Sequence, residues 1–471
     1  MKILLVNLKT GYFSGFPLSI AYISSYLKDK GYKNVVGVDL GVEPEEKLYK
    51  EISNTDVIGF SVMSKSFLGL KRIVKRIKEI NPEIKIVAGG PHATLMPDDF
   101  FKNQLAEIVV IGEGEETMFE LIQVFEGKMN LKDVKGIAYL EKGKMKVTKS
   151  RPWIQDLDSL PFPDRDIVDI EKYNQGIYQK MFGKLSIPIL GSRSCPYNCA
   201  NCMPALRKIA GTYRQRSPEN LKEELKELIK RYGIRKFDFS DNEVSTDREW
   251  LSKVCDVMKE LNITWTGGCR INTMDSEILK KMRESGCDLI FFGIESGSQR
   301  VLNEVIGKNF TLQKARDTVN EAQKLGIRTC CSFMICIPGE KKEEIDDTIN
   351  FALSLNSEKV FMNIANSVPH TRFHFNFEKH NPGLDIYNYD FHGYRTENWD
   401  ETYPEQVKKK IMKRFEKEGY IRYSRNWIDT TMVFYNLKKQ GFLATVFREV
   451  AHFLKNRDMF HINNAIKRLV K

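Results

Sequence analysis

Residues 187–202 read IPILGSRSCPYNCANC, and this stretch decides the fold of the central part of the chain. An apolar, strand-like run ends at residue 192, and Cys195, Cys199 and Cys202 follow it directly. The C-x3-C-x2-C spacing supplies three thiolates, one fewer than a 4Fe-4S cluster has irons, so one iron stays open to another ligand. A zinc site, the alternative, needs a fourth cysteine or histidine nearby, and the next cysteine is Cys255, 53 residues further on. The spacing therefore predicts an iron–sulfur cluster.

Strand-like and helical stretches alternate on the C-terminal side of the cysteines. Ser217 and Pro218 mark the start of the first helix, because serine caps a helix and proline fits its first turn. Together with residues 187–192, the predicted strands make six β/α units, a partial barrel: 236–242, 264–270, 289–296, 328–337 and 359–366. Active sites in such barrels lie at the C-terminal strand ends. The candidate residues at those ends, facing the cysteine loop, are Asp241, Asn242, Arg270, Glu295, Ser296 and Cys336.

The first 130 residues show a second alternating pattern. Helical stretches such as 17–30 and 66–80 separate strand-like runs at 2–7, 35–40, 56–62 and 85–90, and residues 108–116 run from a strand into the helix that follows. Alternation at these lengths predicts a doubly wound, Rossmann-like parallel sheet, which binds ligands at the carboxyl ends of its strands. Those ends carry Asn7 and residues 61–64, 89–92 and 112–115. Glycines there let the backbone approach a bulky ligand, since no Cβ intervenes.

The rest of the chain divides into a connection and a basic C-terminal region. Residues 131–184 are predicted to form a hairpin, over 131–150, and an extended linker whose prolines disfavour a helix. The barrel then covers 185–370, and a mainly helical region covers 371–471. Within it, apolar residues recur at helical spacing over 442–454. Two interpretations stay open for this helix: a cap packed on the barrel, or contact with an anionic lipid surface or polyanionic substrate.

Composition and charge limit the class of protein. The chain has 471 residues, 42% of them hydrophobic, and a formal net charge of +11, which excludes a disordered, collagenous or small disulfide-stapled chain. Residues 401–471 hold 16 Lys and Arg against 7 Asp and Glu, so +9 of the charge lies there. All nine cysteines follow residue 194, and an odd count favours thiols or metal ligands over disulfides. No apolar run approaches the ~18 residues of a membrane-spanning helix, so we expect a cytoplasmic protein, at most peripheral at a membrane.

Taken together, the motifs resemble the radical S-adenosylmethionine (SAM) superfamily. The cysteine motif is joined by RQRSPENLKEEL (214–225), FFGIESGSQRVL (291–302) and SFMICIPGEKKEEI (332–345). The resemblance implies that SAM chelates the open iron, that the reduced cluster cleaves it to a 5'-deoxyadenosyl radical, and that a flavodoxin or ferredoxin type protein donates the electron. It also implies SAM contacts from Tyr197, Asp241, Asn242, Arg270, Glu295 and Ser296. The alternatives are a barrel-mouth salt bridge for Arg270 and Glu295, and a helix cap for Asp241 and Asn242.

The N-terminal domain resembles the cobalamin-binding domain found in one subfamily. Ser61-Val-Met63 and Gly89-Gly90 resemble the second half of its signature, which holds the nucleotide tail. The first half, Asp-x-His-x-x-Gly, is missing, so we expect cobalamin with no histidine on cobalt, and we interpret His92 as a loop residue. The alternative is a domain that has lost its ligand. The resemblance implies cobalamin contacts from Ser61, Met63, Ser64, Gly89, Gly90, His92, Gly112, Gly114 and Glu115.

Two positions depart from the family pattern. Asn201 replaces the usual aromatic residue before the third cysteine, so adenine packing is expected from elsewhere, such as Tyr197. Cys336 replaces a glycine before the Pro-Gly-Glu turn; its thiol either donates a hydrogen atom to a substrate radical or simply packs. The absence of cysteines before Cys195 and after Cys336 argues against methylthiotransferases and auxiliary-cluster maturases.

The predicted function follows from the subfamily. We expect methylation of an unactivated carbon in a small-molecule or lipid-like substrate, with cofactors that carry the difficult chemistry. The alternative within the family is cyclisation or rearrangement without methyl transfer. An alternative from another class is a nucleic-acid-modifying protein that uses the basic tail, but no aromatic-studded RNA-binding module is recognisable.

Overall fold

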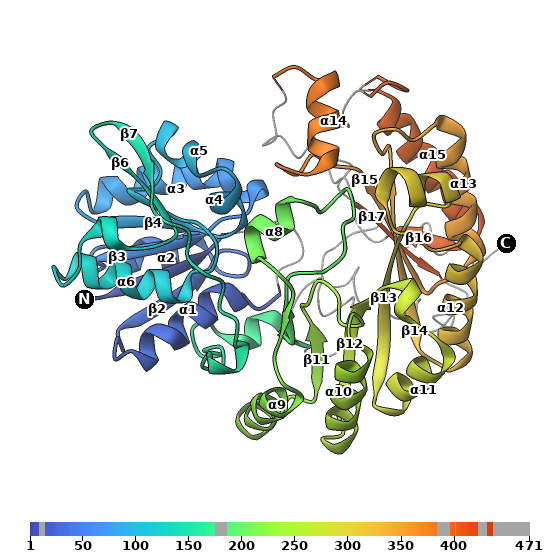
Figure 1. Ribbon diagram of the computed structural model, residues 1–471, viewed down its shortest axis with the longest axis horizontal. Helices are drawn as coiled ribbons and strands as arrows, with labels where there is room; N and C mark the ends of the chain where they lie inside the picture. Colours follow the sequence, from blue (N-terminus) through green and yellow to red (C-terminus); the bar gives the residue numbers. More distant parts are fainter. Residues whose placement is uncertain (9–14, 175–185, 384–395, 401, 423–430, 437–471) are drawn as a thin grey trace.

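The computed structural model describes residues 1–8, 15–174, 186–383, 396–400, 402–422 and 431–436. Two α/β units lie side by side, with the short helix α8 (Ala205–Ala210) between them (Figure 1). The predicted fold class, a Rossmann-like domain followed by a partial barrel, is confirmed.

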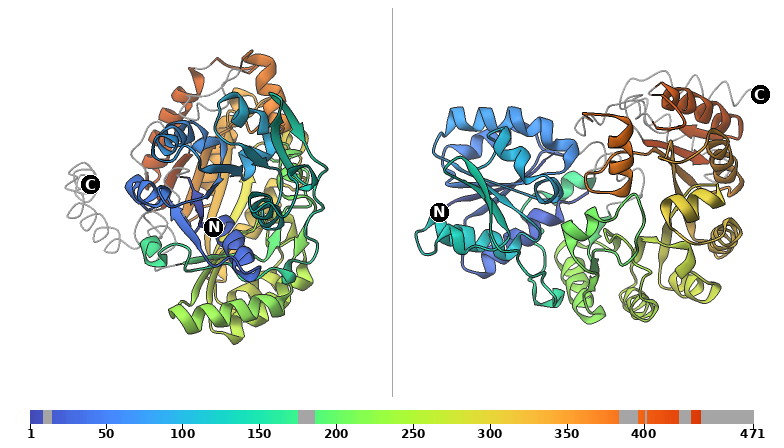
Figure 2. Two further views of the ribbon diagram at one scale, coloured as in Figure 1. Left: turned by 90° about the vertical axis from the view of Figure 1, so that its left-hand side faces the viewer. Right: turned by 45° about the horizontal axis from the view of Figure 1, so that its top comes forward.

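The first unit is a seven-stranded sheet in the order β2-β1-β3-β4-β5-β6-β7. Its strands are β1 (Ile3–Asn7), β2 (Val35–Asp39), β3 (Val57–Ser61), β4 (Lys85–Gly89) and β5 (Ile108–Val110), all parallel, then β6 (Ile137–Glu141) and β7 (Lys144–Val147), both antiparallel. The helices are α1 (Leu18–Asp29), α2 (Glu45–Ile52), α3 (Phe67–Ile80), α4 (Pro91–Leu95), α5 (Pro97–Lys102) and α6 (Glu115–Phe125). Figure 2 shows helices on both faces of this sheet.

Alternate residues of β1 explain why both faces are covered. Ile3 and Leu5 belong to the apolar core that includes α1 and α6, whereas Leu4 and Val6 belong to the core beneath α2 and α3. Successive side chains of a strand point to opposite faces, so a strand buried on both faces reads as a continuous apolar run. This is why the sequence predicts these strands to within about one residue.

The predicted hairpin does not stand apart as part of the linker. Strand β6 pairs with β5, with Val110 opposite Ile137, so the hairpin extends the first sheet at its edge. The described part of the linker, up to residue 174, then runs largely extended, with 3-10 turns at Leu157–Ser159 and Ile170–Asn174. It is tied to the first unit by a Ser24–Asp164 hydrogen bond of 2.6 Å. On the barrel side, the Arg165–Glu224 ion pair is 2.8 Å long and buried.

The second unit is an open barrel of eight strands in the order β16-β17-β15-β14-β13-β12-β11-β8. Its parallel strands are the six predicted ones: β8 (Ile187–Ile189), β11 (Lys236–Phe239), β12 (Thr264–Cys269), β13 (Cys287–Glu295), β14 (Arg328–Ile335) and β15 (Lys359–Ile364). Outside them lie α9 (Pro218–Tyr232), α10 (Arg248–Glu260), α11 (Ser276–Glu284), α12 (Leu312–Lys324) and α13 (Lys342–Ser354) (Figure 1). The Ser217 hydroxyl accepts the Asn220 N–H at 3.0 Å, which confirms the predicted cap of α9.

The described part of the C-terminal region is mainly helical, as predicted. It contains α14 (Arg372–His380) and α15 (Tyr403–Lys417). A hairpin that the sequence does not predict, β16 (Tyr420–Arg422) and β17 (Thr431–Asn436), adds antiparallel strands beside β15. The amphipathic stretch 442–454 lies outside the described residues. Among the residues that are described, no helix combines the length and apolarity needed to cross a membrane.

Candidate active site

The three cysteines lie on one loop that leaves the barrel at β9 (Ser192–Arg193) and returns at β10 (Arg214–Gln215). These two short strands pair antiparallel, with Arg193 opposite Arg214. Ser194 has a φ of +71°, and its hydroxyl donates to the Gly211 carbonyl at 2.7 Å, which closes the loop at its base. Of the three thiols, Cys195 is half-buried, Cys199 buried and Cys202 exposed.

Arg270, at the end of β12, reaches the cysteine loop. Its Nη1 donates to the Cys199 sulfur at 3.3 Å, and its guanidinium carbon lies 4.2 Å from the centre of the Tyr197 ring. The remaining nitrogens donate to the Lys308 carbonyl at 2.5 Å and to Asn272 at 2.8 Å. The predicted juxtaposition of Arg270 with the cluster loop is therefore present.

Glu295 takes a different partner from the one the sequence suggests. Its carboxylate pairs with Lys308 Nζ at 2.9 Å, so the barrel-mouth salt bridge exists for Glu295, but with Lys308 and not with Arg270. Lys308 also donates to the Gly293 carbonyl at 2.5 Å. A Cβ at Gly293 would lie 2.7 Å from the Glu295 carboxylate, so glycine makes room for the pair. Glu295 itself has a φ of +77°, a strained conformation of the kind that clusters at functional sites.

The loop after β11 carries the predicted Asp241 and Asn242. Asp241 accepts hydrogen bonds from the Gly191 N–H at 2.9 Å and the Ser192 hydroxyl at 2.5 Å, and burial raises its pKa to about 7. Asn242 is exposed. Neither caps α10, since the cap is Asp247, which accepts the Trp250 N–H; the helix-cap alternative is wrong.

The missed acid is Glu243, two residues beyond Asp241. It is buried and accepts the Arg270 N–H at 3.1 Å and the Ser245 N–H at 2.9 Å. Burial, and then the charge of Glu243, raise the pKa of the Tyr197 hydroxyl, so the carboxylate lies within electrostatic reach of the cysteine loop. Its position on the same strand-end loop was the one available sequence signal.

Two other predicted residues, Ser296 and Cys336, are buried. Ser296 is fully buried, and its hydroxyl lies 3.2 Å from that of Thr348 on α13. Cys336 is buried, with a φ of +58°, which explains why glycine is usual at this position. Burial also raises the pKa of the Cys336 thiol well above its usual value.

A cavity of about 420 Å³ lies at the carboxyl edge of the first sheet. Gly90, with a φ of +93°, is needed in its wall because a Cβ there would lie 2.9 Å from the Val62 nitrogen. The Ser61 hydroxyl accepts a hydrogen bond from Ser19 at 3.1 Å. Six of the predicted residues line the cavity: Ser61, Gly89, Gly90, Gly112, Gly114 and Glu115.

The other three predicted residues, Met63, Ser64 and His92, are not part of the cavity lining. His92 lies in helix α4, so its interpretation as a loop residue is wrong. It is fully buried, with its ring centre 4.6 Å from that of Phe67 and 5.6 Å from that of Phe100. Its Nδ1 lies 3.0 Å from the Ser64 hydroxyl, and burial lowers its pKa to about 4. Met63 is 44% exposed.

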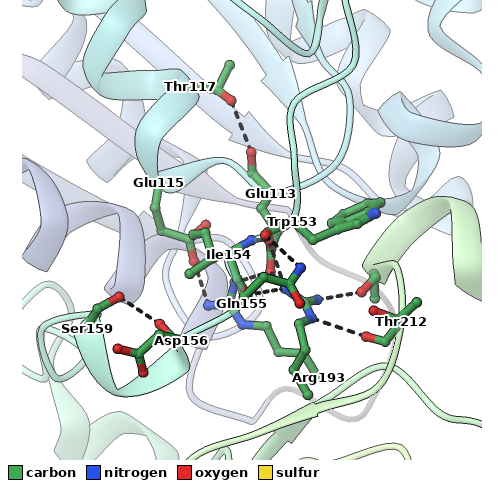
Figure 3. Close-up of polar contacts among 12 residues, drawn as sticks. Glu113, Glu115, Thr117, Trp153, Ile154, Gln155, Asp156, Ser159, Arg193 and Thr212 are labelled. Atoms are coloured by element: carbon green, nitrogen blue, oxygen red, sulfur yellow. Dashed lines mark hydrogen bonds and ion pairs between the residues drawn. The ribbon is translucent and has the colours of Figure 1, made fainter.

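The barrel closes the opposite side of this cavity. Leu190, Arg193, Ile209, Ala210 and Ser240 contribute to the lining. Arg193 pairs with Glu113 and with Glu115, at 2.6 Å in each case (Figure 3). Burial alone would raise the pKa of Glu115, but Arg193 holds it below its usual range. Neither Arg193 nor Glu113 was singled out as a partner from the sequence, because 80 residues separate them.

The donor set fits an iron–sulfur cluster better than a single metal ion. Within the described ranges, no three His, Cys, Asp or Glu side chains converge closely enough to hold one ion. Three cysteines spaced along one loop suit the separate irons of a cluster, and thiolate is the usual ligand for it. The cavity, bounded by glycines and apolar side chains, likewise suits a bulky ligand that inserts at the strand ends.

Comparison with known proteins identifies both domains. The B12 binding domain matches residues 4–122, and the radical SAM superfamily matches residues 189–352. An uncharacterized methyltransferase of Pyrococcus horikoshii is 33% identical over 365 residues, covering 76% of this chain and 78% of that protein. An anaerobic magnesium-protoporphyrin IX monomethyl ester cyclase of Rubrivivax gelatinosus is 27% identical over 395 residues, covering 81% and 69%.

Two solved structures share the fold. The radical SAM methyltransferase TsrM from Kitasatospora setae, with cobalamin and a 4Fe-4S cluster bound, has a TM-score of 0.66 at 17% identity, over 80% of this chain and 78% of that one. The cobalamin-dependent radical SAM enzyme OxsB has a TM-score of 0.65 at 20% identity, over 95% and 66%. The cofactors are accordingly a 4Fe-4S cluster, SAM and cobalamin. The chain belongs to the radical SAM superfamily, in the group whose members carry an N-terminal B12-binding domain.

Proposed function

We propose that this protein is a cobalamin-dependent radical SAM methyltransferase that acts on an unactivated carbon of a small molecule. One observation carries the proposal: Arg193, two residues before Cys195, is itself part of the wall of the B12-domain cavity. The two cofactor sites therefore face one another across a single interface. When bound, the cluster and SAM supply a carbon-centred radical, and cobalamin supplies a methyl group.

We assign the cluster to Cys195, Cys199 and Cys202. SAM carries a carboxylate and an ammonium group, which need a cation and an anion. Arg270 is the cation, because it already touches the cysteine loop. Glu243 and Glu295 are the carboxylates, since both lie at strand ends beside that loop. The remaining assignments divide by exposure: Tyr197 and Asn242 contact SAM, whereas the buried Asp241 and Ser296 hold their loops in position.

We assign the cobalamin tail to the cavity, with Ser61, Gly89, Gly90, Gly112, Gly114 and Glu115 in its wall. His92 leaves cobalt without a histidine ligand, because its ring is enclosed by Phe67 and Phe100. Ser64 supports His92 through their 3.0 Å contact. Met63, exposed beside the strand end, is left to contact the rim of the bound molecule.

A second candidate function is cyclisation or rearrangement without methyl transfer. The relative from Rubrivivax gelatinosus, named as a cyclase, favours it. The same cluster loop and cavity would serve both reactions, so the fate of the SAM methyl group separates them.

A lipid-like substrate and a peripheral membrane contact stay proposals that rest on charge alone. Residues 401–471 carry +9, and each basic residue near an anionic leaflet is worth about 1 kcal/mol. The full-length protein should bind anionic vesicles more than neutral ones, weakly at high salt, and truncation before Gly441 should remove the difference. Equal binding to both vesicle types contradicts the contact.

The experiment is anaerobic reconstitution followed by turnover. Reconstituted protein should bind about four irons, and SAM should change the EPR spectrum of the reduced cluster. Incubation with methyl-labelled SAM, a flavodoxin or ferredoxin type donor and a metabolite extract should give a labelled product. Cys199→Ala should abolish iron binding, SAM response and label transfer, whereas Cys255→Ala, on helix α10, should abolish none.

The outcomes distinguish the candidates. 5'-Deoxyadenosine with an altered but unlabelled product favours cyclisation or rearrangement. Purified protein that holds zinc and takes up no iron or sulfide overturns both.

A further inference from the structure

A buried group of four charges joins the B12-domain cavity to the cluster loop. Glu113 accepts hydrogen bonds from Arg193 Nη1 at 2.6 Å and from Arg214 Nη1 at 2.9 Å. Glu115 accepts one from Arg193 Nη2 at 2.6 Å. Figure 3 shows Arg193 extending toward the two glutamates from the opposite side of the interface. Two anions and two cations balance, so the group is neutral as a whole.

Water has little access to this group. The side chains of Arg193, Glu113, Glu115 and Arg214 are exposed by 13%, 8%, 7% and 4%. In such surroundings an ion pair is screened little, and loss of one partner leaves the other buried and unpaired. Separating the glutamates of the first domain from the arginines of the barrel is therefore costly, and we expect the two segments to move as one.

One side of the charged group lines the cavity, and the other lies at the base of the cysteine loop. Glu113 lies in the β5–α6 loop and Glu115 is the first residue of α6; both line the cavity, as does Arg193. Arg193 and Arg214 face each other on β9 and β10, the paired strands from which the cysteine loop emerges. A ligand that fixes the position of the β5–α6 loop therefore also fixes the base of the cysteine loop, through these ion pairs.

Linker residues Trp153 and Ile154 contact both sides of the charged group. The Ile154 N–H donates to Glu113 at 2.8 Å, and the Ile154 carbonyl accepts from Arg214 at 2.6 Å. Trp153 packs so closely that a Cβ at Gly211 would lie 2.5 Å from its ring, and a Cβ at Gly112 would lie 3.2 Å from it. One wall of the cavity and one end of the cysteine loop therefore touch the same tryptophan.

We propose that Arg193 is a positioning residue that couples occupancy of the cobalamin cavity to the geometry of the SAM-binding cluster loop. This inference rests on the proposed function, since it assigns the two sites to those cofactors. Cobalamin binding tightens SAM binding at the cluster, and by thermodynamic reciprocity SAM tightens cobalamin binding by the same factor. Arg193 acts through its ion pairs with Glu113 and Glu115.

The test measures SAM affinity by EPR titration of the reduced, reconstituted full-length enzyme, with and without hydroxocobalamin. Couplings between sites typically amount to about 5- to 150-fold in affinity, and the wild-type enzyme should show at least about fivefold. Arg193→Gln should keep its iron and its SAM affinity in the absence of cobalamin. Because Arg193 also lines the cavity, the cobalamin affinity of the variant is measured as well, and at saturating hydroxocobalamin the change in SAM affinity should vanish. Arg193→Lys, which can reach one glutamate at a time, should restore part of it.

Arg151→Gln is the matched control. Arg151 pairs with Glu116 at 2.9 Å and with Glu120, on the same helix α6, but it belongs to the linker and not to the cluster loop. It should keep the full coupling. If Arg193→Gln fails to fold, Glu115→Gln removes one of the two ion pairs and should reduce the coupling.

The contrary results are separable. A wild-type enzyme that binds cobalamin, seen by its visible spectrum, but has the same SAM affinity with and without it overturns the inference and leaves the proposed function intact. Loss of coupling in Arg151→Gln also overturns it, because any interface arginine would then serve. A wild-type enzyme that binds no cobalamin counts against both.

Discussion

Arg270 and Tyr197 are stacked, with the guanidinium carbon 4.2 Å from the centre of the ring, and the same guanidinium donates to the Cys199 sulfur at 3.3 Å. A cation held over an aromatic face keeps its charge while its orientation is fixed. Arg270 is thereby held at the edge of the cluster loop, where the carboxylate of SAM is proposed to lie.

Arg270→Met should weaken SAM binding and leave the cluster in place. A hydrogen bond to a charged group is worth about 1.5–3 kcal/mol, so SAM affinity should fall by at least about tenfold. Iron content should not change, because the three thiolates remain. EPR titration with SAM measures the change. Arg248→Met, which removes an exposed pair with Asp275 on the outer helices, is the control and should behave as wild type.

Cys336→Gly should keep product formation. Cys336 is buried and has a φ of +58°, a conformation that glycine adopts with the least strain. The relief of backbone strain partly offsets the packing that is lost with the thiol, so the free energy of unfolding should change by about 1 kcal/mol or less. Turnover and thermal unfolding measured on one preparation test this. A variant with full iron content and normal 5'-deoxyadenosine yield but no product would instead identify Cys336 as the hydrogen-atom donor.

His92→Ala should destabilise the first domain without changing the spectrum of bound cobalamin. The ring packs between Phe67 and Phe100, and deleting a buried side chain of this size costs about 2–4 kcal/mol. Chemical unfolding and the visible spectrum of the cobalamin complex are the two measurements. A spectral change typical of a lost nitrogen ligand would place His92 on cobalt and contradict the assignment.

Glu340→Gln should flatten the dependence of stability on pH. Burial raises the pKa of Glu340 to about 8, from an ordinary 4.5. Between these values the folded state holds a proton that the unfolded state has released, so the free energy of unfolding falls as pH rises. The wild-type protein should lose a few kcal/mol between about pH 5 and about pH 8, and Glu340→Gln should lose less.

Glu344→Gln tests the opposite case, a carboxyl group whose pKa is lowered in the folded protein. Burial alone would raise the pKa of Glu344, but hydrogen bonds from Arg300, the Lys341 N–H and Ser298 lower it to about 2. Its contribution is complete above pH 4.5 and is lost only as pH falls toward 2, so the titration of Glu344 itself adds no slope between about pH 5 and about pH 8. Because the charge of Glu344 also helps to raise the pKa of Glu340, Glu344→Gln should keep most of the wild-type slope but not all of it. Urea unfolding at both pH values measures both variants. If the free energy of unfolding changes equally with pH in the wild type and in Glu340→Gln, then Glu340 is ionised in the folded protein.

Most of the architecture was predictable because its signals are local. The parallel strands of the first sheet are buried on two faces, so their apolar runs stand out between polar helices and turns. Short elements were harder: α4 and α5 hold five and six residues, and the β16–β17 hairpin adds a three-residue strand, lengths at which periodicity carries little information.

The structure brings several of the predicted site residues together, but the sequence does not identify their side-chain partners. Cys195, Asp241, Arg270 and Glu295 all lie at one end of the barrel, as strand-end reasoning requires. Glu295, however, pairs with Lys308, which follows the π-helix Val301–Ile306 and belongs to no motif. Side-chain partners depend on rotamers and on loop conformations, such as the positive φ of Glu295, that no spacing rule specifies.

By itself, the sequence determined the cluster and the fold class. Three thiolates within eight residues are held together by the chain itself, so their chemistry follows from spacing, and the alternation of buried strands with helices requires parallel sheets. Only the tertiary structure decided that His92 packs inside the first domain and that Arg193 bridges Glu113 and Glu115. These contacts join segments far apart in the chain, and they form because two domains, each folded by local patterns, bury their charges against one another.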